Sequence, residues 1–149
     1  MSIDISKKPT VRREATAEGT ILLNSTSMKR IKDDSVEKGN IYELAKAAAI
    51  HGAKNTPTLL FFCHPIPILG INVVITTEMN IVKITVHVIS EGKTGCEMEA
   101  LTGVSSGLLQ IWDMVKMYEK DSDGQYPATR IDSLKVLKKV KKAITNDRK

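Results

Sequence analysis

The fold of this chain is decided by residues 81–90, which read IVKITVHVIS. Apolar and polar residues alternate along this stretch. Its two faces are Val82, Ile84, Val86 and Val88 on one side, and Ile81, Lys83, Thr85 and His87 on the other. Because successive side chains of a strand point to opposite sides, this alternation predicts a strand with one buried face.

The stretch is joined to its neighbours by short turns and helical patterns. Glu78-Met79-Asn80 separates it from the apolar segment Gly70–Thr77, which predicts a hairpin. Asn40 is placed to cap a helix over Ile41–Gly52, and we expect Gly52 to end it. Glu97–Lys120 is the longest helical pattern of the chain.

Three more elements complete the predicted order. Strands are expected at Glu14–Leu23 and Arg130–Leu137, and a short helix at Met28–Lys32 with its N-cap among residues 24–27. The main elements therefore run strand, helix, strand, strand, helix, strand. This order predicts a ferredoxin-like α+β fold, an antiparallel sheet with both long helices on one face.

Length and composition indicate an ordinary globular protein. We expect 149 residues, 42% hydrophobic and 26% charged, to form one domain. Two cysteines, Cys63 and Cys96, permit one disulfide but favour a reduced intracellular protein. No apolar run approaches the ~18 residues of a membrane span, and Met1–Arg13 lacks a signal-peptide core. We therefore expect a cytoplasmic protein with no membrane contact.

The net charge of +5 favours anionic partners, either nucleic acid or phosphorylated small molecules. Much of the excess lies near the C-terminus. The cations there are Lys135, Lys138, Lys139, Lys141, Lys142, Arg148 and Lys149. The same pattern is typical of a solvated helix end or tail.

The long helical pattern has an apolar and a polar side. Its polar side collects Glu99, Thr102, Ser106, Gln110, Asp113 and Lys120, with Lys116 at its edge, and we expect this side to face water. Asp113 and Lys116 can pair at i, i+3, either as a surface ion pair or as a proton-transfer pair. Glu99 and Asp113 are separated by about 21 Å, so a ligand touching both needs a second chain.

The loop Cys63-His64-Pro65-Ile66-Pro67 is another candidate. Pro65 favours an extended His64, which could donate a hydrogen bond to a phosphate or carbonyl. A histidine with a satisfied structural hydrogen bond fits equally well. No set of residues has zinc-like spacing, so no metal is expected, and nothing indicates a lowered pKa for Cys63 as a nucleophile.

Several segments together resemble one family. They are Ile3-Asp4-Ile5-Ser6-Lys7-Lys8, Arg13-Glu14-Ala15, Lys38-Gly39-Asn40, Ala53-Lys54-Asn55-Thr56, Cys63-His64-Pro65-Ile66, residues 92–102 (GKTGCEMEALT) and Asp113-Met114-Val115-Lys116. The chain resembles the cyclic pyranopterin monophosphate synthases, the MoaC family of molybdenum cofactor biosynthesis, over nearly its whole length.

The resemblance implies a reaction and an assembly. Members convert 3′,8-cyclo-7,8-dihydroguanosine triphosphate to cyclic pyranopterin monophosphate and pyrophosphate. A radical S-adenosylmethionine enzyme acts upstream, and no metal or organic cofactor is expected. The family fold is ferredoxin-like, and the implied assembly is a hexamer, a trimer of dimers with active sites at dimer interfaces.

The resemblance also implies site residues. The catalytic residues fall on Asp113, Lys116 and Lys38. The substrate contacts fall on Phe62, Cys63, His64, Met98 and Glu99, with Glu97, Arg13 and Lys54 lining or supporting the pocket. Two departures are a phenylalanine, Phe62, where leucine is usual, and a C-terminal segment without the usual glycines, in which Lys139 is the best match to a lysine of the family.

We hypothesise that Lys116 is the general acid or base and that Asp113 orients it or transfers a proton. Lys38, Arg13 and Lys54 would hold the triphosphate, and Glu97 and Glu99 would read the ring's N–H donors. The rival function is a basic RNA-binding module, but the strands lack an exposed aromatic pair for stacking bases. An assembly protein with a decayed site is a third reading, against which the complete set of polar residues argues.

Overall fold

The computed structural model describes residues 1–144 and contains a four-stranded antiparallel sheet. The strands are β1 (Val11–Leu22), β2 (Ile68–Glu78), β3 (Ile81–Gly92) and β4 (Arg130–Lys142). Their spatial order is β2-β3-β1-β4, so β1 and β3 are central. Each strand extends beyond the range predicted for it at one end at least, most of all β4, which continues five residues past Leu137.

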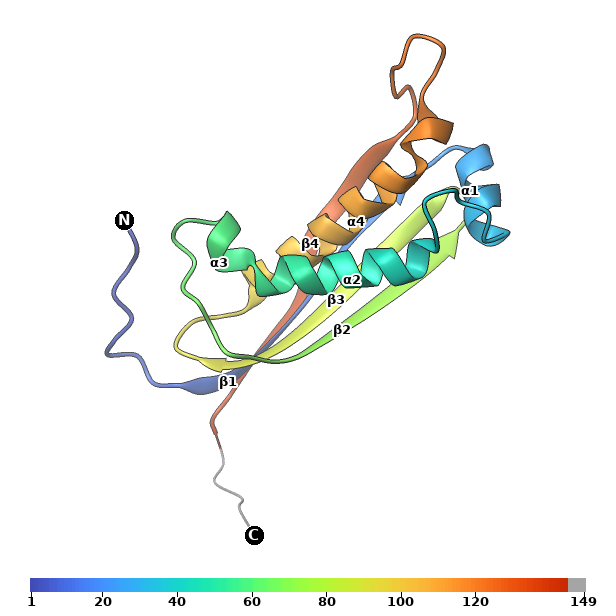
Figure 1. Ribbon diagram of the computed structural model, residues 1–149. Coiled ribbons are helices and arrows are strands. Elements are labelled where there is room, and N and C mark those ends of the chain that lie inside the picture. Colours follow the sequence, from blue (N-terminus) through green and yellow to red (C-terminus); the bar gives the residue numbers. More distant parts are fainter. Residues whose placement is uncertain (145–149) are drawn as a thin grey trace.

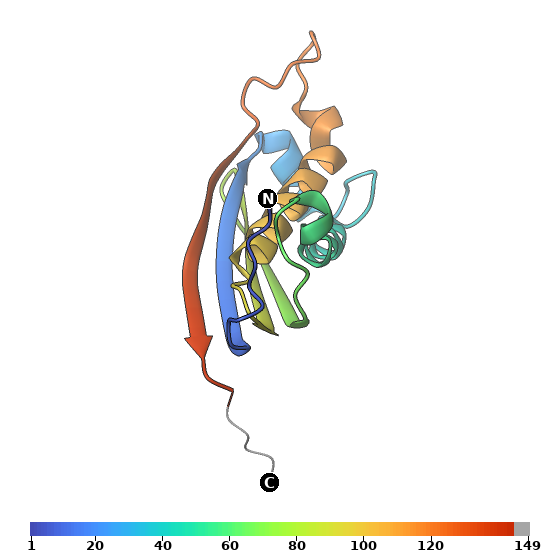
Figure 2. The ribbon, with the colours of Figure 1, turned by 90° about the vertical axis from the view of Figure 1, so that its left-hand side faces the viewer.

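The helices are α1 (Ser25–Lys32), α2 (Ile41–Lys54), α3 (Thr56–Leu59) and α4 (Glu97–Glu119). The long helices α2 and α4 cover the same face of the sheet and cross in front of it in Figure 1. Figure 2 shows the sheet from its edge, with the helices on one side only. The predicted ferredoxin-like α+β architecture is therefore confirmed.

Alternation along β3 produces the core as predicted. The inward residues Val82, Ile84, Val86 and Val88 are all fully buried. They meet small or apolar residues from β1 and from α4, which include Ala15, Ala17, Ile21, Val104, Leu108 and Ile111. Burial of these apolar side chains is the main source of stability.

Local capping explains where the helices begin. The Asn24 side chain accepts a hydrogen bond from the Ser27 backbone N–H at 2.9 Å, and Asn40 accepts from Glu43 at 3.0 Å. Each bond satisfies one of the free N–H groups of a helix N-terminus. The predicted β2–β3 hairpin turn is confirmed as well, with Met79 in the left-handed region at φ 51°.

The prediction that Gly52 ends its helix is wrong. The helix continues to Lys54, and Gly52 is buried against α4. A Cβ at Gly52 would lie 2.1 Å from Ser106 Oγ and 3.0 Å from the Thr102 carbonyl oxygen. The glycine therefore permits close helix contact, and Pro57 prevents the helix from continuing much further. The short helix α3 follows directly, with Pro57 in its first turn.

The prediction that the polar side of the long helix faces water is wrong for Glu99. That carboxylate is 3% exposed, and Thr102 and Ser106 are half-buried. The reason is that α4 packs against two partners, the sheet on one side and α2 on the other. An amphipathic pattern marks one buried face, and it does not report a second contact made through small residues.

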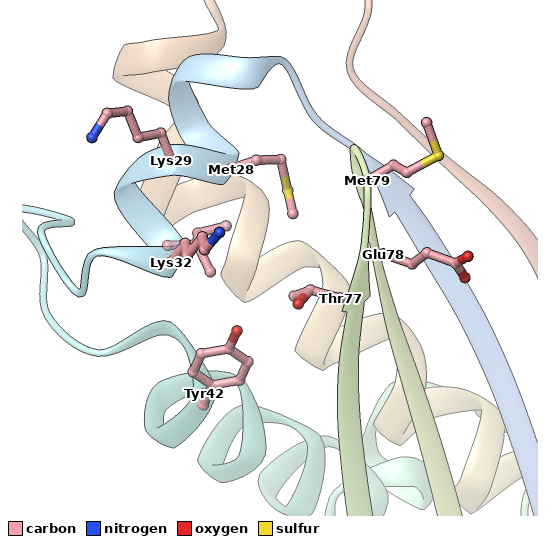
Figure 3. Close-up of a pocket in the computed structure, with 8 residues that line it drawn as sticks. Met28, Lys29, Lys32, Tyr42, Thr77, Glu78 and Met79 are labelled. Carbon is pink, nitrogen blue, oxygen red and sulfur yellow. The ribbon is translucent and has the colours of Figure 1, made fainter.

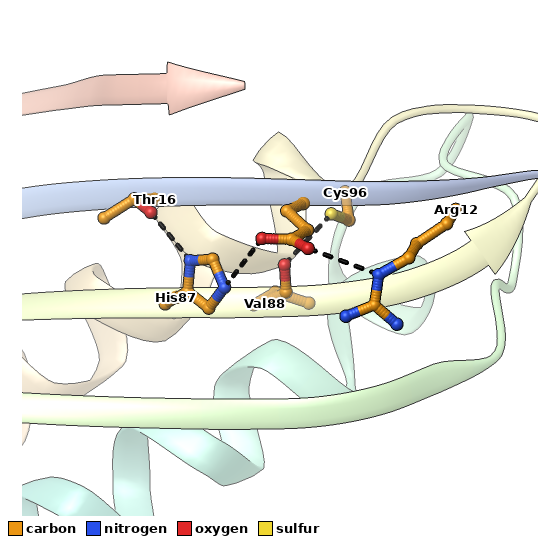
Figure 4. A network of polar contacts seen from close by, with 6 residues as sticks. Arg12, Thr16, His87, Val88 and Cys96 are labelled. Atoms are coloured by element: carbon orange, nitrogen blue, oxygen red, sulfur yellow. Dashed lines mark hydrogen bonds and ion pairs between the residues drawn. The ribbon is translucent and has the colours of Figure 1, made fainter. Parts of the chain in front are cut away.

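Polar side chains cover the sheet face opposite the helices (Figure 4). Glu14 pairs with Arg12 Nε at 3.3 Å and with His87 Nε2 at 3.3 Å, and Thr16 Oγ1 lies 2.8 Å from His87 Nδ1. The thiol of Cys96 instead donates to the Val88 carbonyl at 3.5 Å. Within residues 1–144, no helix has the length and apolar character of a membrane span.

Candidate active site

The three predicted catalytic residues meet at one point. Asp113, on the solvent-facing side of α4, accepts from Lys116 Nζ through Oδ1 at 2.8 Å and from Lys38 Nζ through Oδ2 at 3.0 Å. Lys38 also donates to the Asp113 carbonyl oxygen at 2.9 Å. Since Lys38 comes from the loop before α2, the cluster joins two distant parts of the sequence.

The pair of lysines determines the protonation of this cluster. Hydrogen bonds from Lys116 and then Lys38 lower the pKa of Asp113, and the hydrogen bond with Asp113 raises the pKa of Lys116. The carboxylate thus favours the charged ammonium form of Lys116. With its pKa raised, Lys116 stays protonated in the isolated subunit, which is the form that a proton donor requires.

A second group of predicted residues surrounds a small cavity of about 130 Å³ at the N-terminal end of α4. Its lining is Phe62, Cys63, His64, Thr94, Gly95, Glu97, Met98 and Glu99. The loop before β2 provides the first three residues, and the β3–α4 connection and first helical turn provide the others. The fold therefore brings five predicted substrate contacts together with Glu97.

Burial distinguishes Glu99 from the other carboxylates of this end. Burial, with a smaller contribution from the charge of the nearby Glu97, raises the pKa of Glu99 from 4.5 to about 6, although a backbone hydrogen bond partly opposes the shift. Burial and the same two glutamates raise the pKa of Cys63. A thiol whose pKa is raised is a poor nucleophile at neutral pH, so the geometry favours a contact role for Cys63.

Lys139 lies beside the same end of α4. Its Nζ is 3.1 Å from Glu97 Oε1, and a further cavity of about 160 Å³ has Arg13 and Lys139 in its wall. Among residues 1–144, Glu97 Oε2 and Arg13 Nε are buried side-chain atoms without a hydrogen-bond partner. Buried polar atoms of this kind are costly unless a ligand or water meets them.

Lys54, the remaining predicted residue, lies at the same end. Lys54 is the exposed last residue of α2, and not beyond the helix as predicted. The adjacent Gly52 contacts α4 at Thr102, which places this end of α2 beside the first turns of α4. His64 is partly exposed, and its Nε2 lies 3.1 Å from Ser2 Oγ, a contact that the sequence pattern did not reveal.

One subunit does not unite the two groups. Glu99 and Asp113 lie on one unbroken helix, so their separation stays at about 21 Å. The predicted distance argument therefore holds in the folded chain. The basic tail residues Arg148 and Lys149 lie outside the described part.

Other hollows of the surface involve different residues. A cavity of about 620 Å³ lies between α1, the start of α2 and the β2–β3 turn, with Met28, Lys32, Tyr42, Thr77 and Met79 around it (Figure 3). None of the predicted site residues lines it. An open groove between α2 and α4 reaches Asp113 and is bordered by Leu109. In the described range, no three His, Cys, Asp or Glu side chains gather as metal ligands would.

Comparisons with known proteins agree with the resemblance. The sequence model of the MoaC family matches residues 2–142. The probable cyclic pyranopterin monophosphate synthase of Methanococcoides burtonii is 50% identical over 144 residues, covering 97% of this chain and 91% of that protein. The corresponding protein of Saccharolobus solfataricus is 49% identical over 139 residues, 93% of each chain.

A third relative has a slightly different name. The probable cyclic pyranopterin monophosphate synthase accessory protein of Methanothermobacter thermautotrophicus is 48% identical over 139 residues, 93% of this chain and 87% of that protein. The match of the family model covers both groups of site residues described above. The chain belongs to the MoaC family.

Proposed function

We propose that this chain is a cyclic pyranopterin monophosphate synthase, a lyase of molybdenum cofactor biosynthesis. Its substrate is 3′,8-cyclo-7,8-dihydroguanosine triphosphate, and its products are cyclic pyranopterin monophosphate and pyrophosphate. The reaction takes place in the cytoplasm without a metal or organic cofactor, on one domain spanning residues 1–149. The observation that carries the proposal is the contact of Lys116 and Lys38 with one carboxylate, Asp113, in a MoaC-family chain.

Lys116 is the proposed general acid. Its ammonium group is held by Asp113 at 2.8 Å, so the nitrogen is in a fixed position and another of its N–H groups can face the substrate. After donation, the neutral amine can take a proton from the rearranging substrate. Lys38 shares the same carboxylate, and its positive charge opposes the return of a proton to Lys116.

The other end of α4 binds the substrate in this proposal. Arg13, Lys54 and Lys139 are cations that can hold phosphate oxygens, and each charge-assisted hydrogen bond contributes ~1.5–3 kcal/mol. Glu97 has one oxygen free among the described groups, which suits an N–H donor of the guanine-derived ring. His64, Phe62, Cys63, Met98 and Glu99 form the wall around that ring.

A complete site then requires two subunits. The proposed acid and the proposed ring pocket lie about 21 Å apart on α4, farther than one small substrate spans. A second copy that faces its partner across the site would bring Lys116 of one chain to the ring pocket of the other. We propose the family assembly, a hexamer made of three such dimers, and a radical S-adenosylmethionine enzyme as the supplier of the substrate.

The function is tested by incubating the purified chain with the cyclic GTP-derived intermediate. Pyranopterin product and pyrophosphate should form in equal amounts. Lys116→Ala should lower turnover by roughly 10²–10⁴-fold, the usual contribution of general acid–base catalysis, while the protein stays folded. Lys46→Ala, an exposed lysine on α2, is the matched control and should remain active. Full turnover by Lys116→Ala would remove this lysine from the chemistry.

The shared site is tested by mixing inactive variants. Lys116→Ala changes the catalytic cluster on α4 and His64→Ala changes the pocket at the N-terminal end of that helix, and each variant should be inactive. After dissociation and reassociation together, a mixed dimer contains one site with both changes and one site with neither. Activity should therefore return in the mixture, to a level below that of the wild-type protein. No recovery in a mixture shown to contain mixed dimers contradicts a site built from two chains.

A further inference from the structure

Residues 1–8 form an irregular segment that lies beside the loop of His64 and the β3–α4 connection. Two contacts join this segment to the rest of the chain. Ser2 Oγ lies 3.1 Å from His64 Nε2, and Lys93 Nζ donates to the Ser6 carbonyl oxygen at 2.7 Å. The two contacts reach both sides of the proposed ring pocket, because His64 and the neighbour of Lys93, Thr94, line it.

The segment has a defined shape of its own. The Asp4 side chain accepts from the Ser6 backbone N–H at 2.8 Å, and the Lys8 N–H donates to the Ile5 carbonyl at 3.0 Å. The first turn shortens the segment between its two attachment residues, Ser2 and Ser6, and the second turn extends just past Ser6. A hydrogen bond from Ser6, together with the charges of Lys93 and His64, lowers the pKa of Asp4 and favours its carboxylate form. This carboxylate lies in sequence between the two attachment residues, Ser2 and Ser6.

Packing does little to hold this segment in place. Met1 is fully exposed and Ile3 is 75% exposed, so its first residues bury little apolar surface. Its position depends on the polar contacts made by Ser2 and Lys93. Removing either contact should therefore release the segment without disturbing the core.

The imidazole of His64 depends on the same contact. Among residues 1–144, Ser2 is the group hydrogen-bonded to its ring. A bond at Nε2 restricts rotation of the ring and leaves Nδ1 for a ligand, since the two ring nitrogens have distinct roles. The backbone of this loop is held by the Cys63 N–H, which donates to the Leu60 carbonyl at 3.0 Å, and by Ile66, which packs against the core, whereas Phe61 and Phe62 are largely exposed.

We propose that residues 1–8 form a strap along the substrate pocket, in which Lys93 anchors the segment and Ser2 positions the imidazole of His64 for the substrate. Ser2 and Lys93 are thus positioning residues, and the inference rests on the proposed function for its catalytic consequence. The strap also gives a role to Lys93, which precedes Thr94 and Gly95 of the pocket wall. Its ammonium group donates to the backbone of the strap.

The first test measures the histidine directly and needs no substrate. Long-range ¹H–¹⁵N spectra of the intact chain report the tautomer of each imidazole, and His64→Gln identifies the signals of His64. Ser2→Ala should move the ¹⁵N shifts of His64 and leave those of His51 and His87 in place. Ser2→Thr, which keeps the hydroxyl, should preserve the wild-type shifts. Unchanged His64 signals in Ser2→Ala overturn the proposal.

The second test follows turnover of the cyclic GTP-derived intermediate. Ser2→Ala and Lys93→Met should each lower kcat/KM by about three- to tenfold, the effect of losing one hydrogen bond. Ser2→Thr and Lys93→Arg should restore it, and Lys46→Met, an exposed lysine on α2, is the control. Wild-type protein without activity would refute the proposed function alone. Active wild type with equally active Ser2→Ala and Lys93→Met would refute the strap.

Discussion

Two glutamates at opposite ends of α4 are equally buried but differ in their surroundings. Glu99, in the first turn, is 3% exposed, and Glu119, the last residue, is 4% exposed. The Glu119 carboxylate accepts from the Asn24 N–H at 3.0 and 3.1 Å, from Thr129 Oγ1 at 2.8 Å and from Ser27 Oγ. In residues 1–144 no such set of donors meets Glu99.

The difference in hydrogen-bond donors distinguishes a structural carboxylate, Glu119, from one that lines the pocket, Glu99. A buried carboxylate with several donors is stabilised in place, and Glu119 thereby joins the start of α1, the end of α4 and the segment before β4. A buried carboxylate without them keeps its proton more tightly, and the pKa of Glu99 is raised to about 6. Burial of such a group costs folding free energy, and a ligand that binds in the pocket can relieve this cost.

The largest expected effect on stability comes from Glu119→Ala. It leaves the part-buried Asn24 N–H and the buried hydroxyls of Ser27 and Thr129 without their acceptor. Each such group costs ~1–3 kcal/mol, so the free energy of unfolding should fall by roughly 3 kcal/mol or more. Urea unfolding at constant pH measures the loss, with exposed Glu37→Ala as the control. An unchanged midpoint would contradict a structural role for this network.

Glu99→Gln should act in the opposite direction and depend on pH. Because the folded-state pKa is raised, the wild-type contribution is fully present below about 4.5 and is lost as the pH rises through about 6. The difference corresponds to about 2 kcal/mol. Glutamine cannot ionise, so the variant should match wild type near pH 4 and be up to about 2 kcal/mol more stable above pH 7.

The measurement is the difference in unfolding free energy between Glu99→Gln and wild type from pH 4 to 8. Taking the difference removes the contribution of carboxylates whose pKa is lowered, such as Asp4 and Asp113. A difference that does not vary with pH would show that Glu99 is ionised equally in both states.

A single donor at the other end should matter less. Thr129→Val removes one of the hydrogen bonds to Glu119 and preserves the shape of the side chain. The carboxylate retains the Asn24 and Ser27 donors, so the loss should be about 1 kcal/mol. Thermal unfolding of Thr129→Val beside Thr85→Val, on the opposite sheet face, measures it. A loss as large as that of Glu119→Ala would place the whole effect in this one contact.

The sequence predicts the sheet and its helices because their signals are local. The alternation of β3 and the caps Asn24 and Asn40 appear within a few residues. Glu119 gave no such signal, since its donors lie about 90 residues before it and ten residues after it. The prediction that Gly52 ends its helix is wrong for the same reason, because the residue it packs against, Ser106, is remote in sequence.

The site residues show the same division. Asp113 and Lys116 are visible as an i, i+3 pair, whereas their shared contact with Lys38 follows from the fold. The resemblance to the MoaC family is confirmed by the family match, and the roles of the individual residues stay predictions. No periodic pattern marks Ser2 as a neighbour of His64, because an irregular segment has no repeating face.

Lys139→Met should have the smallest effect on stability, and it tests a third carboxylate of α4. Glu97 pairs with Lys139 at 3.1 Å, with side chains 31% and 55% exposed, so water already solvates much of the pair. Loss of an exposed pair changes stability by ~0–1 kcal/mol.

If Lys139 holds a phosphate, however, KM should rise by about ten- to a hundredfold with little change in kcat, the effect of one charge-assisted contact. Lys135→Met, a neighbour on β4 that pairs with Glu18 on the sheet, is the control. A small KM change would restrict Lys139 to its contact with Glu97 and leave phosphate binding to Arg13 and Lys54.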